Sequence, residues 1–400
     1  MIVIILAAGK GKRMQPLTDT RLKGSLPILN QPLLVRLADM INSSGILDKL
    51  VMIISPWQKD AMEELFSQTE YSSKVQFAFQ DPPQGTGDAL AQAEPFMDNY
   101  QQCLVLNGDI LTNLEEILPS FIAHHNKIQA ACTILVYPGK NKRYGQLQIT
   151  PDGKVLAIKE KITGEITDEI GYINAGVYLF EREIFQALKV TPLSPRGEYE
   201  ITDAISLLGV KRTIGAIKTH AWMSLENPID LFKAQNFTQP NKQLLCMQFH
   251  SGSEIGFKAV EEIFFEEGPE LKFSDIIIRG PVLIGKETLL EPGAIIGPNT
   301  FIGNSCEIGS KTVLSNSLLM DSCRIGMNCH ITNLICAENI LIGENVVISP
   351  EKSNLKNSFS LENFAILGGK TIITTNTKIT KGTSISAHSV ITNDSNIDKK

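Results

Sequence analysis

A six-residue repeat constrains the C-terminal part of this chain more than any other feature. From residue 284 onward an aliphatic residue recurs at every sixth position, as Ile284, Leu290, Ile296, Ile302, Ile308, Leu314 and Met320. The phase slips by one at Ile325, is broken near residues 355–359, and returns as Ile373, Ile379, Ile385 and Ile391. Each hexad supplies a short strand with one side chain pointing to an axis, so only stacked coils bury a continuous core. The sequence predicts a β-helix over residues 276–395.

The cysteines fit the interior of such a solenoid. Cys306, Cys323 and Cys329 each lie two residues before an inward aliphatic position, which is again an inward position on a strand. Buried free cysteine behaves as a small hydrophobe, so these residues are predicted to be core residues and not metal ligands. The chain has 7 cysteines and no C-x-x-C pair, a pattern that supplies neither a disulfide framework nor a zinc site. Reduced thiols indicate a cytoplasmic protein.

Charge and hydropathy exclude two classes of partner. The formal net charge is -6, from 37 basic and 43 acidic residues, which gives no large positive field for nucleic acid. The apolar opening run, residues 2–8, is far too short to span a membrane and lacks the basic region of a signal peptide. We therefore expect neither nucleic acid nor membrane as a partner, and interpret the run as a buried strand.

The first part of the chain alternates apolar β-rich runs with helical patterns, over residues 3–7, 33–41, 51–54, 61–66, 75–79, 89–93 and 104–106. Such alternation predicts an α/β domain with a mostly parallel sheet covered by helices. The last of these strands is followed by Asn107-Gly108-Asp109. Open α/β sheets bind ligands at the carboxyl ends of their strands, so Asp109 is a candidate functional residue.

The strongest local motif is a glycine-rich loop that follows the first strand, Leu6-Ala7-Ala8-Gly9-Lys10-Gly11-Lys12-Arg13-Met14. Two glycines let the backbone approach phosphate oxygens, and the cations supply the charge that phosphates need. The loop is neither a dinucleotide fingerprint, because Met14 replaces the third glycine, nor a P-loop. A plain βα turn with two solvated cations remains an equal alternative for this loop alone.

Further motifs, through a family resemblance, favour the phosphate-binding interpretation of the glycine-rich loop over a plain βα turn. The glycine loop is followed in order by Lys23, Gln80, Gln84-Gly85-Thr86-Gly87, Asn107-Gly108-Asp109, Tyr144-Gly145, Glu160-Lys161, Ile173-Asn174-Ala175-Gly176 and Gly197-Glu198-Tyr199. In this order they closely resemble the sugar-1-phosphate nucleotidylyltransferases. The resemblance covers essentially the whole chain, because many members append a left-handed β-helix. It implies a Rossmann-like nucleotidyltransferase domain over residues 1–236, a linker over 237–275 and an all-β left-handed parallel β-helix over 276–395.

The resemblance also implies residue roles. Leu6, Ala8, Gly9, Gly11, Gln80, Gly85 and Thr86 would bind the nucleotide, with Gln80 and Gly85 facing the base. Arg13 would stabilise the transition state, Lys23 would bridge the phosphates of both substrates, and Asp109 would hold Mg²⁺. Gly145, Glu160 and Asn174 would take sugar hydroxyls, and Lys161 the phosphate of the sugar. The simpler alternatives are a helix N-cap for Asp109, a solvated surface pair for Glu160-Lys161, and a hydrogen bond to strand backbone for Asn174. For Glu198, a role in the site and a purely structural role are about equally favoured.

Two departures from the family pattern are expected to weaken substrate or metal binding. The usual Pro-Lys-Pro-Leu stretch is here Leu22-Lys23-Gly24-Ser25, which loosens a rigid segment. Trp222-Met223-Ser224 stands where relatives often carry Trp-x-Asp, whose aspartate is a second metal carboxylate, so Ser224 is a weaker candidate ligand and Asn227 stands nearby. A non-catalytic, nucleotide-sugar-binding regulatory subunit is therefore an alternative.

The β-helix has two predicted uses. Bifunctional relatives carry out acetyl transfer from acetyl-CoA there, with a histidine where this chain has Met327; His330 and His388 are interpreted as corner residues. Assembly into a trimer or larger homo-oligomer is favoured over acetyl transfer. The reaction expected overall converts a nucleoside triphosphate and a hexose-1-phosphate into a nucleotide-sugar and pyrophosphate. UTP or dTTP with glucose-1-phosphate or N-acetylglucosamine-1-phosphate is favoured, and guanylyl or adenylyl transfer stays open.

Overall fold

The structure, a computed structural model, describes residues 1–139, 141, 143–160, 171–237, 257–259, 262–265, 271–273, 275–349 and 360–393. The chain divides into two compact units. The first comprises residues 1–10 and 33–224, and the second comprises residues 11–32 and 225–400. Each unit has a buried hydrophobic core of its own. The linker predicted over residues 237–275 falls largely outside the described residues, and the predicted domain bounds stay a prediction.

The first unit contains a mixed nine-stranded sheet. Its main order is β10-β9-β11-β6-β1-β4-β5, with β8 pairing β11 and β12. Strands β5, β4, β1 and β6 are mutually parallel, whereas β11 runs antiparallel to β6 and β8. The strands are β1 (Ile2–Leu6), β4 (Lys49–Ile54), β5 (Val75–Phe79), β6 (Gln102–Asn107), β8 (Cys132–Pro138), β9 (Gln146–Ile149), β10 (Val155–Lys159), β11 (Tyr172–Glu181) and β12 (Ile214–Lys218).

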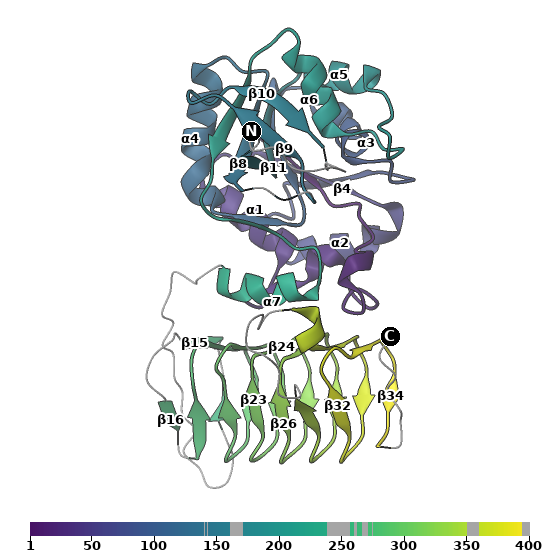
Figure 1. The fold of residues 1–400 in the computed structure, drawn as a ribbon, viewed down its shortest axis with the longest axis vertical. Coiled ribbons are helices and arrows are strands. Elements are labelled where there is room, and N and C mark those ends of the chain that lie inside the picture. Colours follow the sequence, from purple (N-terminus) through teal and green to yellow (C-terminus); the bar gives the residue numbers. More distant parts are fainter. Residues whose placement is uncertain are drawn as a thin grey trace. The chain divides into compact units, whose positions relative to one another are not determined.

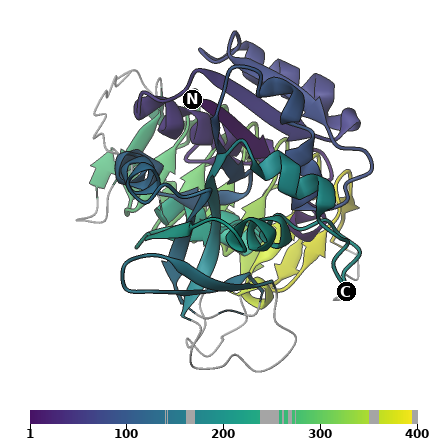
Figure 2. The ribbon, with the colours of Figure 1, turned by 90° about the horizontal axis from the view of Figure 1, so that it is seen from above.

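Helices flank both faces of this sheet (Figures 1 and 2). They are α1 (Leu33–Ser43), α2 (Lys59–Ser67), α3 (Thr86–Ala91), α4 (Leu114–Lys127), α5 (Ile184–Val190) and α6 (Ile201–Gly209). Ile2 and Ile4 of β1 share a core with residues of α3, α5 and α6. Because side chains alternate along a strand, Val3 and Ile5 are buried on the opposite face. Burial on both faces explains the continuous apolar run at the start of the chain.

The second unit contains a β-helix built from three seven-stranded sheets (Figure 1). The first strand of each sheet pairs antiparallel and all later pairs are parallel. The first sheet has β14 (Phe257–Lys258), β19 (Leu289–Leu290), β22 (Glu307–Ile308), β25 (Arg324–Ile325), β28 (Leu341–Ile342), β31 (Ile372–Ile373) and β34 (Val390–Ile391). The second has β15 (Ile263–Phe265), β18 (Val282–Ile284), β21 (Thr300–Ile302), β24 (Ser317–Leu319), β27 (Leu334–Cys336), β30 (Ala365–Leu367) and β33 (Ser384–Ile385). The third has β16 (Leu271–Phe273), β17 (Ile276–Ile278), β20 (Ile295–Ile296), β23 (Val313–Ser315), β26 (His330–Thr332), β29 (Val347–Ser349) and β32 (Lys378–Thr380).

The strand register confirms the repeat and corrects its phase. Ile284 pairs with Ile302, and Ile302 pairs with Leu319, not with Met320. The slip therefore lies one hexad earlier than the sequence indicated, a distinction hidden because both Leu319 and Met320 are buried. The break near residues 355–359 lies outside the described residues. The fold class predicted from the sequence, an α/β domain followed by a left-handed parallel β-helix, is confirmed.

The cysteines of the solenoid occupy the predicted core positions. Cys306, Cys323 and Cys329 are buried. Burial raises the pKa of the Cys323 and Cys329 thiols, so they stay protonated and apolar in character. Among the described residues no group of three or more His, Cys, Asp or Glu side chains could hold a metal ion. No helix in the described ranges is long and apolar enough to cross a membrane.

The segment 11–32 belongs to the unit of the β-helix. It contains the short 3-10 helices η1 (Lys12–Met14) and η2 (Lys23–Ser25) and the strands β2 (Pro27–Ile28) and β3 (Gln31–Pro32). Helix α7 (Pro228–Phe237) joins it through Gln235, whose amide accepts from Leu29 N at 2.8 Å and donates to the Pro27 carbonyl at 3.1 Å. Phe232 of α7 packs against Phe301 and Phe364 of the solenoid unit, with ring centroids 5.9 and 5.1 Å apart.

Candidate active site

At the start of the glycine loop, side chains bond to the backbone carbonyls of residues 7 and 8, while no described atom lies close to Gly9. Ser55 Oγ donates to the Ala8 carbonyl at 3.0 Å, and Gln58 Nε2 donates to the Ala7 carbonyl at 3.3 Å. A side-chain Cβ added at Gly9 would meet no described atom within 4 Å. The backbone at Gly9 is therefore accessible to a ligand, as phosphate binding requires. Ser55 and Gln58 were not among the residues predicted from the sequence, although their S-x-x-Q spacing is the signature of the capping box that they form.

Gly11, Thr18 and Lys23 pack together in the second unit. Gly11 has a φ of 65°, and a Cβ there would lie 3.1 Å from Lys23 Cβ. Thr18 Oγ1 donates to the Gly11 carbonyl at 3.0 Å. Both the left-handed backbone and the close approach of Lys23 favour glycine. Two residues that the resemblance selected, Gly11 and Lys23, are thus neighbours in space.

Arg13 forms an ion pair that the sequence did not indicate. Its Nη1 lies 3.1 Å from Glu226 Oε2, with side chains that are 68% and 12% exposed, respectively. Glu226 precedes α7, and its backbone N–H donates to Asp230 Oδ2 at 3.0 Å. An exposed cation next to a partly buried carboxylate can exchange that partner for a phosphate.

The backbone next to Asp109 is bonded to the end of β1, where the glycine loop begins, and it pairs with the strand that contains Ser224. Gly108 N donates to the Leu6 carbonyl at 2.9 Å, which joins the end of β6 to the end of β1. Strand β13 (Trp222–Ser224) pairs antiparallel with β7 (Ile110–Thr112), and Ser224 is opposite Ile110, the residue after Asp109. Asp109, which immediately precedes β7, is therefore one residue away from the partner of Ser224. One carboxylate and one hydroxyl suit Mg²⁺, which takes its remaining ligands from substrate phosphates and water.

The residues predicted to face the base form a tightly bonded scaffold. Gln80 is buried, and its Nε2 donates to the Gly85 carbonyl at 2.9 Å and to Asp88 Oδ2 at 2.7 Å. Gly85 has a φ of 109°, and a Cβ there would lie 2.5 Å from the Tyr199 carbonyl oxygen. Thr86 Oγ1 accepts from Ile201 N at 3.1 Å. Since both amide hydrogens of Gln80 are bound internally, a base would meet its carbonyl oxygen first.

The residues predicted to bind the sugar come together. Asn174 N donates to the Gly145 carbonyl at 2.9 Å, and a Cβ on Gly145 would lie 3.0 Å from Glu160 Oε2. A side chain at position 145 would therefore crowd the Glu160 carboxylate. Lys161 lies outside the described residues, and its predicted role stays a prediction.

The Asn174 side chain also has a structural role. Its Oδ1 accepts from Gly176 N at 3.1 Å and its Nδ2 donates to the Tyr178 hydroxyl at 2.9 Å. These bonds span the register shift between Asn174 and Tyr178 in the pairing of β11 with β8. Burial raises the pKa of Tyr178, so its hydroxyl stays neutral. One amide hydrogen of Asn174 beyond these bonds is the group that could meet a sugar hydroxyl.

Arg196 connects three carboxylates and was not selected from the sequence. It lies 3.6 Å from Glu160, 3.7 Å from Glu198 and in closer contact with Glu200. Partial burial lowers the pKa of Arg196, but the three carboxylates outweigh burial and raise it. Thr202 Oγ1 donates to Glu160 Oε2 at 3.1 Å. Glu160 is thus held in place by Arg196 and Thr202.

An aromatic cluster supports the turn that carries Gly145. Trp222 contacts Tyr144 edge to face and Tyr137 at a tilt, with ring centroids 5.0 and 5.7 Å apart. Trp222 Nε1 donates to the Ala175 carbonyl at 2.9 Å, so the indole also joins β13 to β11. The cluster connects the strand of Ser224 with the segments of Gly145 and Asn174.

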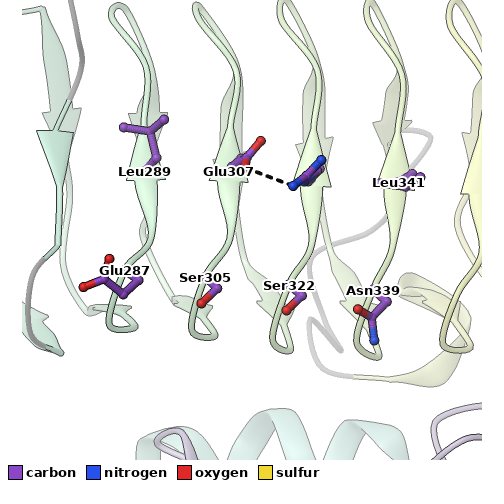
Figure 3. Close-up of a pocket in the computed structure, with 8 residues that line it drawn as sticks. Glu287, Leu289, Ser305, Glu307, Ser322, Asn339 and Leu341 are labelled. Atoms are coloured by element: carbon purple, nitrogen blue, oxygen red, sulfur yellow. Dashed lines mark ion pairs between the residues drawn. The ribbon is translucent and has the colours of Figure 1, made fainter.

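A concave surface lies on the β-helix (Figure 3). This groove of about 570 Å³ has one row of residues at the turns and one on the strands: Glu287, Ser305, Ser322 and Asn339, then Leu289, Glu307, Arg324 and Leu341. Glu307 and Arg324 form an ion pair at 3.4 Å. Of the residues predicted for nucleotidyl transfer that the structure describes, none lines the groove.

No histidine is found among the described residues that line the groove, so none of them could act as a base for acetyl transfer. Met327 is exposed but carries no titratable group. His330 is exposed, as predicted, but it is the first residue of strand β26 and does not lie at a corner. His388 has a φ of 60° in a turn and is exposed, as expected of a corner residue.

Fold and site together define an α/β domain with a glycine-rich loop at the end of its first strand, followed by a β-helix. Residues 2–241 match the nucleotidyl transferase family, and the chain belongs to that family. Residues 278–372 match the GMPPB C-terminal domain.

Relatives and solved structures agree with this assignment. The chain is 30% identical over 238 residues to a bifunctional protein GlmU of Methanocaldococcus jannaschii, covering 59% of this chain and 54% of that protein. It is 30% identical to a bifunctional sugar-1-phosphate nucleotidylyltransferase/acetyltransferase of Sulfurisphaera tokodaii, over 68% of this chain and 63% of that protein. The chain thus matches little more than half of the length of such relatives. A putative glucose-1-phosphate thymidylyltransferase structure from Bacillus anthracis shares the fold, with 22% identity, a TM-score of 0.53, and coverage of 60% of this chain and 98% of that one.

Proposed function

We propose that this protein is a sugar-1-phosphate nucleotidylyltransferase, which joins a nucleoside triphosphate and a hexose-1-phosphate into a nucleotide-sugar and releases pyrophosphate. The observation that carries the proposal is the junction of the open loop at Gly9 with Asp109. The Gly108 to Leu6 hydrogen bond ties a phosphate-binding backbone to a carboxylate at the carboxyl edge of one sheet. Family membership of residues 2–241 supports the same reaction class.

The proposed chemistry needs charge neutralisation more than proton transfer. An oxygen of the sugar phosphate attacks the α-phosphorus of the triphosphate, and pyrophosphate leaves in line. Because the attacking oxygen is already anionic near neutral pH, no general base is required, and catalysis rests on positioning and on cations. The backbone at Gly9 and Gly11 binds the triphosphate, Arg13 stabilises the charge of transfer, and Lys23 bridges the phosphates of both substrates.

The metal role fits the residues present. Asp109, with Ser224 as a weaker partner, would hold Mg²⁺ together with phosphate oxygens of the substrate. Bound there, the ion would neutralise negative charge on the triphosphate. Glu160, Gly145 and Asn174 orient the sugar, while Arg196 keeps the Glu160 carboxylate in place.

The proposed substrates are UTP or dTTP with glucose-1-phosphate or N-acetylglucosamine-1-phosphate. They follow from the Gln80 and Gly85 segment, and the B. anthracis protein that shares the fold is named for thymidylyl transfer. We further propose that the enzyme works in the cytoplasm and that its β-helix assembles it into a homotrimer or larger homo-oligomer. Light scattering that shows a monomer at micromolar concentration would refute this assembly.

Pyrophosphate release tests the proposal directly. Purified protein with Mg²⁺ is assayed across four nucleoside triphosphates and a panel of sugar-1-phosphates. We expect strong release with one pair and little with the others. Release with no pair, from protein whose circular dichroism shows a folded state, would refute the catalytic assignment.

A regulatory, nucleotide-sugar-binding subunit is the second candidate, and Ser224 is the observation that favours it. A hydroxyl is a weaker metal ligand than the carboxylate that relatives often carry there. Calorimetric binding of nucleotide-sugar without turnover would support this candidate, and activity gained by Ser224→Asp would show that the second carboxylate was the missing part. Acetyl transfer from acetyl-CoA in the β-helix is a third alternative, and it is disfavoured because no histidine lines the groove among the residues that the structure describes.

A further inference from the structure

An acidic pair on the β-helix holds the segment 11–32 through two neighbouring residues, Thr20 and Arg21. Thr20 Oγ1 donates to Glu338 Oε1 at 2.8 Å. Arg21 places Nε 3.5 Å from Glu338 Oε2 and Nη2 3.8 Å from Asp321 Oδ2. The side chains of Arg21 and Glu338 are only 21% and 12% exposed. This contact is therefore more desolvated than an ordinary surface ion pair, and loss of one partner leaves a costly charge.

Hydrogen bonds within the solenoid hold the parts of the chain that carry these two carboxylates. Asp321 Oδ1 accepts from Asn304 N at 2.8 Å, on the preceding coil. Asn339 N donates to the Asp321 carbonyl at 3.0 Å, so the residue after Glu338 is tied to the coil of Asp321. Stacked coils thus present Asp321 and Glu338 at a spacing that the β-helix determines.

The fit between segment and solenoid is close at two further points. Ala387 N donates to Asp19 Oδ2 at 3.3 Å. A Cβ added at Gly369 would lie 2.4 Å from Thr20 Oγ1, so a glycine is needed for Thr20 to approach this coil. Three consecutive residues, 19–21, therefore all contact the β-helix, and Thr20 and Arg21 share Glu338.

We propose that Arg21 is a positioning residue for Lys23, and that the β-helix, through Asp321 and Glu338, sets the geometry of the phosphate-binding loop. The inference rests on the proposed function, in which Lys23 contacts substrate phosphates. Arg21 precedes Lys23 by two residues, and Lys23 packs on Gly11. Proline is absent on both sides of Lys23, where Leu22 and Gly24 stand, so the chain there has more conformational freedom to lose. Contacts to the solenoid supply the restraint that the prolines give in the Pro-Lys-Pro-Leu stretch usual in the family.

Kinetics of Arg21 variants give the first test. Arg21→Ala is expected to lower kcat/KM by about 10-fold, because a displaced Lys23 loses contact with phosphates. Arg21→Lys should recover part of the loss, since one charged contact remains. Arg324→Ala is the matched control, because it breaks an ion pair of the same β-helix that does not touch segment 11–32. Wild-type kcat/KM in Arg21→Ala would overturn the proposal.

A double-mutant cycle separates positioning from general stability. In a Lys23→Ala background, Arg21→Ala should lower kcat/KM little further, because Arg21 acts through Lys23. A merely structural role would lower activity by the same factor in both backgrounds. Equal, multiplicative effects would therefore overturn the inference even if each single variant is impaired.

Hydrogen exchange distinguishes failure of this inference from failure of the proposed function. On the full chain without substrates, Arg21→Ala should speed amide exchange over residues 11–25 and leave the core strands β1 and β6 unchanged. If the wild-type protein releases no pyrophosphate with any substrate pair, the proposed function fails, but exchange still reports on the anchoring. Unchanged exchange over residues 11–25 in Arg21→Ala would overturn the anchoring itself.

Discussion

The two compact units bury their cores in different ways. In the β-helix each inward residue packs on the equivalent residue of the next coil, as Ile284 on Ile302, so contacts repeat at short sequence separation. In the α/β unit the candidate site joins distant segments, such as Leu6 with Gly108 and Trp222 with Ala175. We infer that substitutions in the solenoid core act mainly on stability, whereas substitutions at the sheet edge act mainly on chemistry.

The largest expected effect tests the chemical side of this comparison. Asp109→Ala should lower turnover by about 10³-fold, equivalent to about 4 kcal/mol, because the proposed metal loses its only carboxylate ligand among the assigned residues. Pyrophosphate release measures the loss, and circular dichroism should show an unchanged fold. Turnover within about twofold of wild type would refute the metal role of Asp109.

A neighbouring pair of residues tests the stability side. Ile373 is 1% exposed and Ile372 is 39% exposed, on the same strand β31. Ile373→Ala should destabilise the β-helix by about 2–5 kcal/mol, through lost burial and a cavity. Ile372→Ala is the control and should change stability by much less. Hydrogen exchange of amides in the coils measures both, and equal effects would contradict the assignment of inward positions.

A buried histidine gives the α/β unit a pH dependence. His125 bonds to Thr133 and Glu181, and burial lowers its pKa below the ordinary value of about 6.5 despite the nearby carboxylate. The folded unit therefore keeps His125 neutral where the unfolded chain takes up a proton. Stability should fall as the pH drops below about 6.5, by at most about 1.4 kcal/mol per pH unit.

The tryptophans make this prediction measurable in one unit alone. Both tryptophans of the chain, Trp57 and Trp222, lie in the first unit, so urea unfolding followed by fluorescence reports on that unit. His125→Asn should flatten the decline between pH 7 and pH 5. His330→Asn, at an exposed site of the β-helix, should leave it unchanged. A decline that persists in His125→Asn would assign it to other groups.

The smallest expected effect concerns the Arg13 ion pair. Glu226→Gln should lower the KM for the nucleoside triphosphate by about fivefold, because the carboxylate no longer competes with phosphate for Arg13. Initial rates at varied triphosphate concentration measure the change. A raised KM would instead mean that Glu226 orients Arg13 for the substrate.

Local patterns in the sequence predicted the elements and some of the candidate site. Glycine at 9 and 11, the apolar first strand and the carboxylate after β6 are each readable within a few residues. Ser55 and Gln58 were readable too, through their capping-box spacing. The internal bonds of Gln80 and Asn174 were not, because a side-chain amide serves equally well as a ligand contact or a backbone partner.

The sequence by itself determined the repeating core of the solenoid and the alternation of the α/β unit, because both patterns arise from periodicities of one strand or one turn. Tertiary structure decided the phase at Leu319, the ion pair of Arg13 and the anchoring of Arg21. Thr20 and Glu338 are 318 residues apart in the chain, and Leu29 and Gln235 are 206 apart. No local periodicity encodes which of many polar side chains will meet at such separations, since only the packed units bring them within bonding distance.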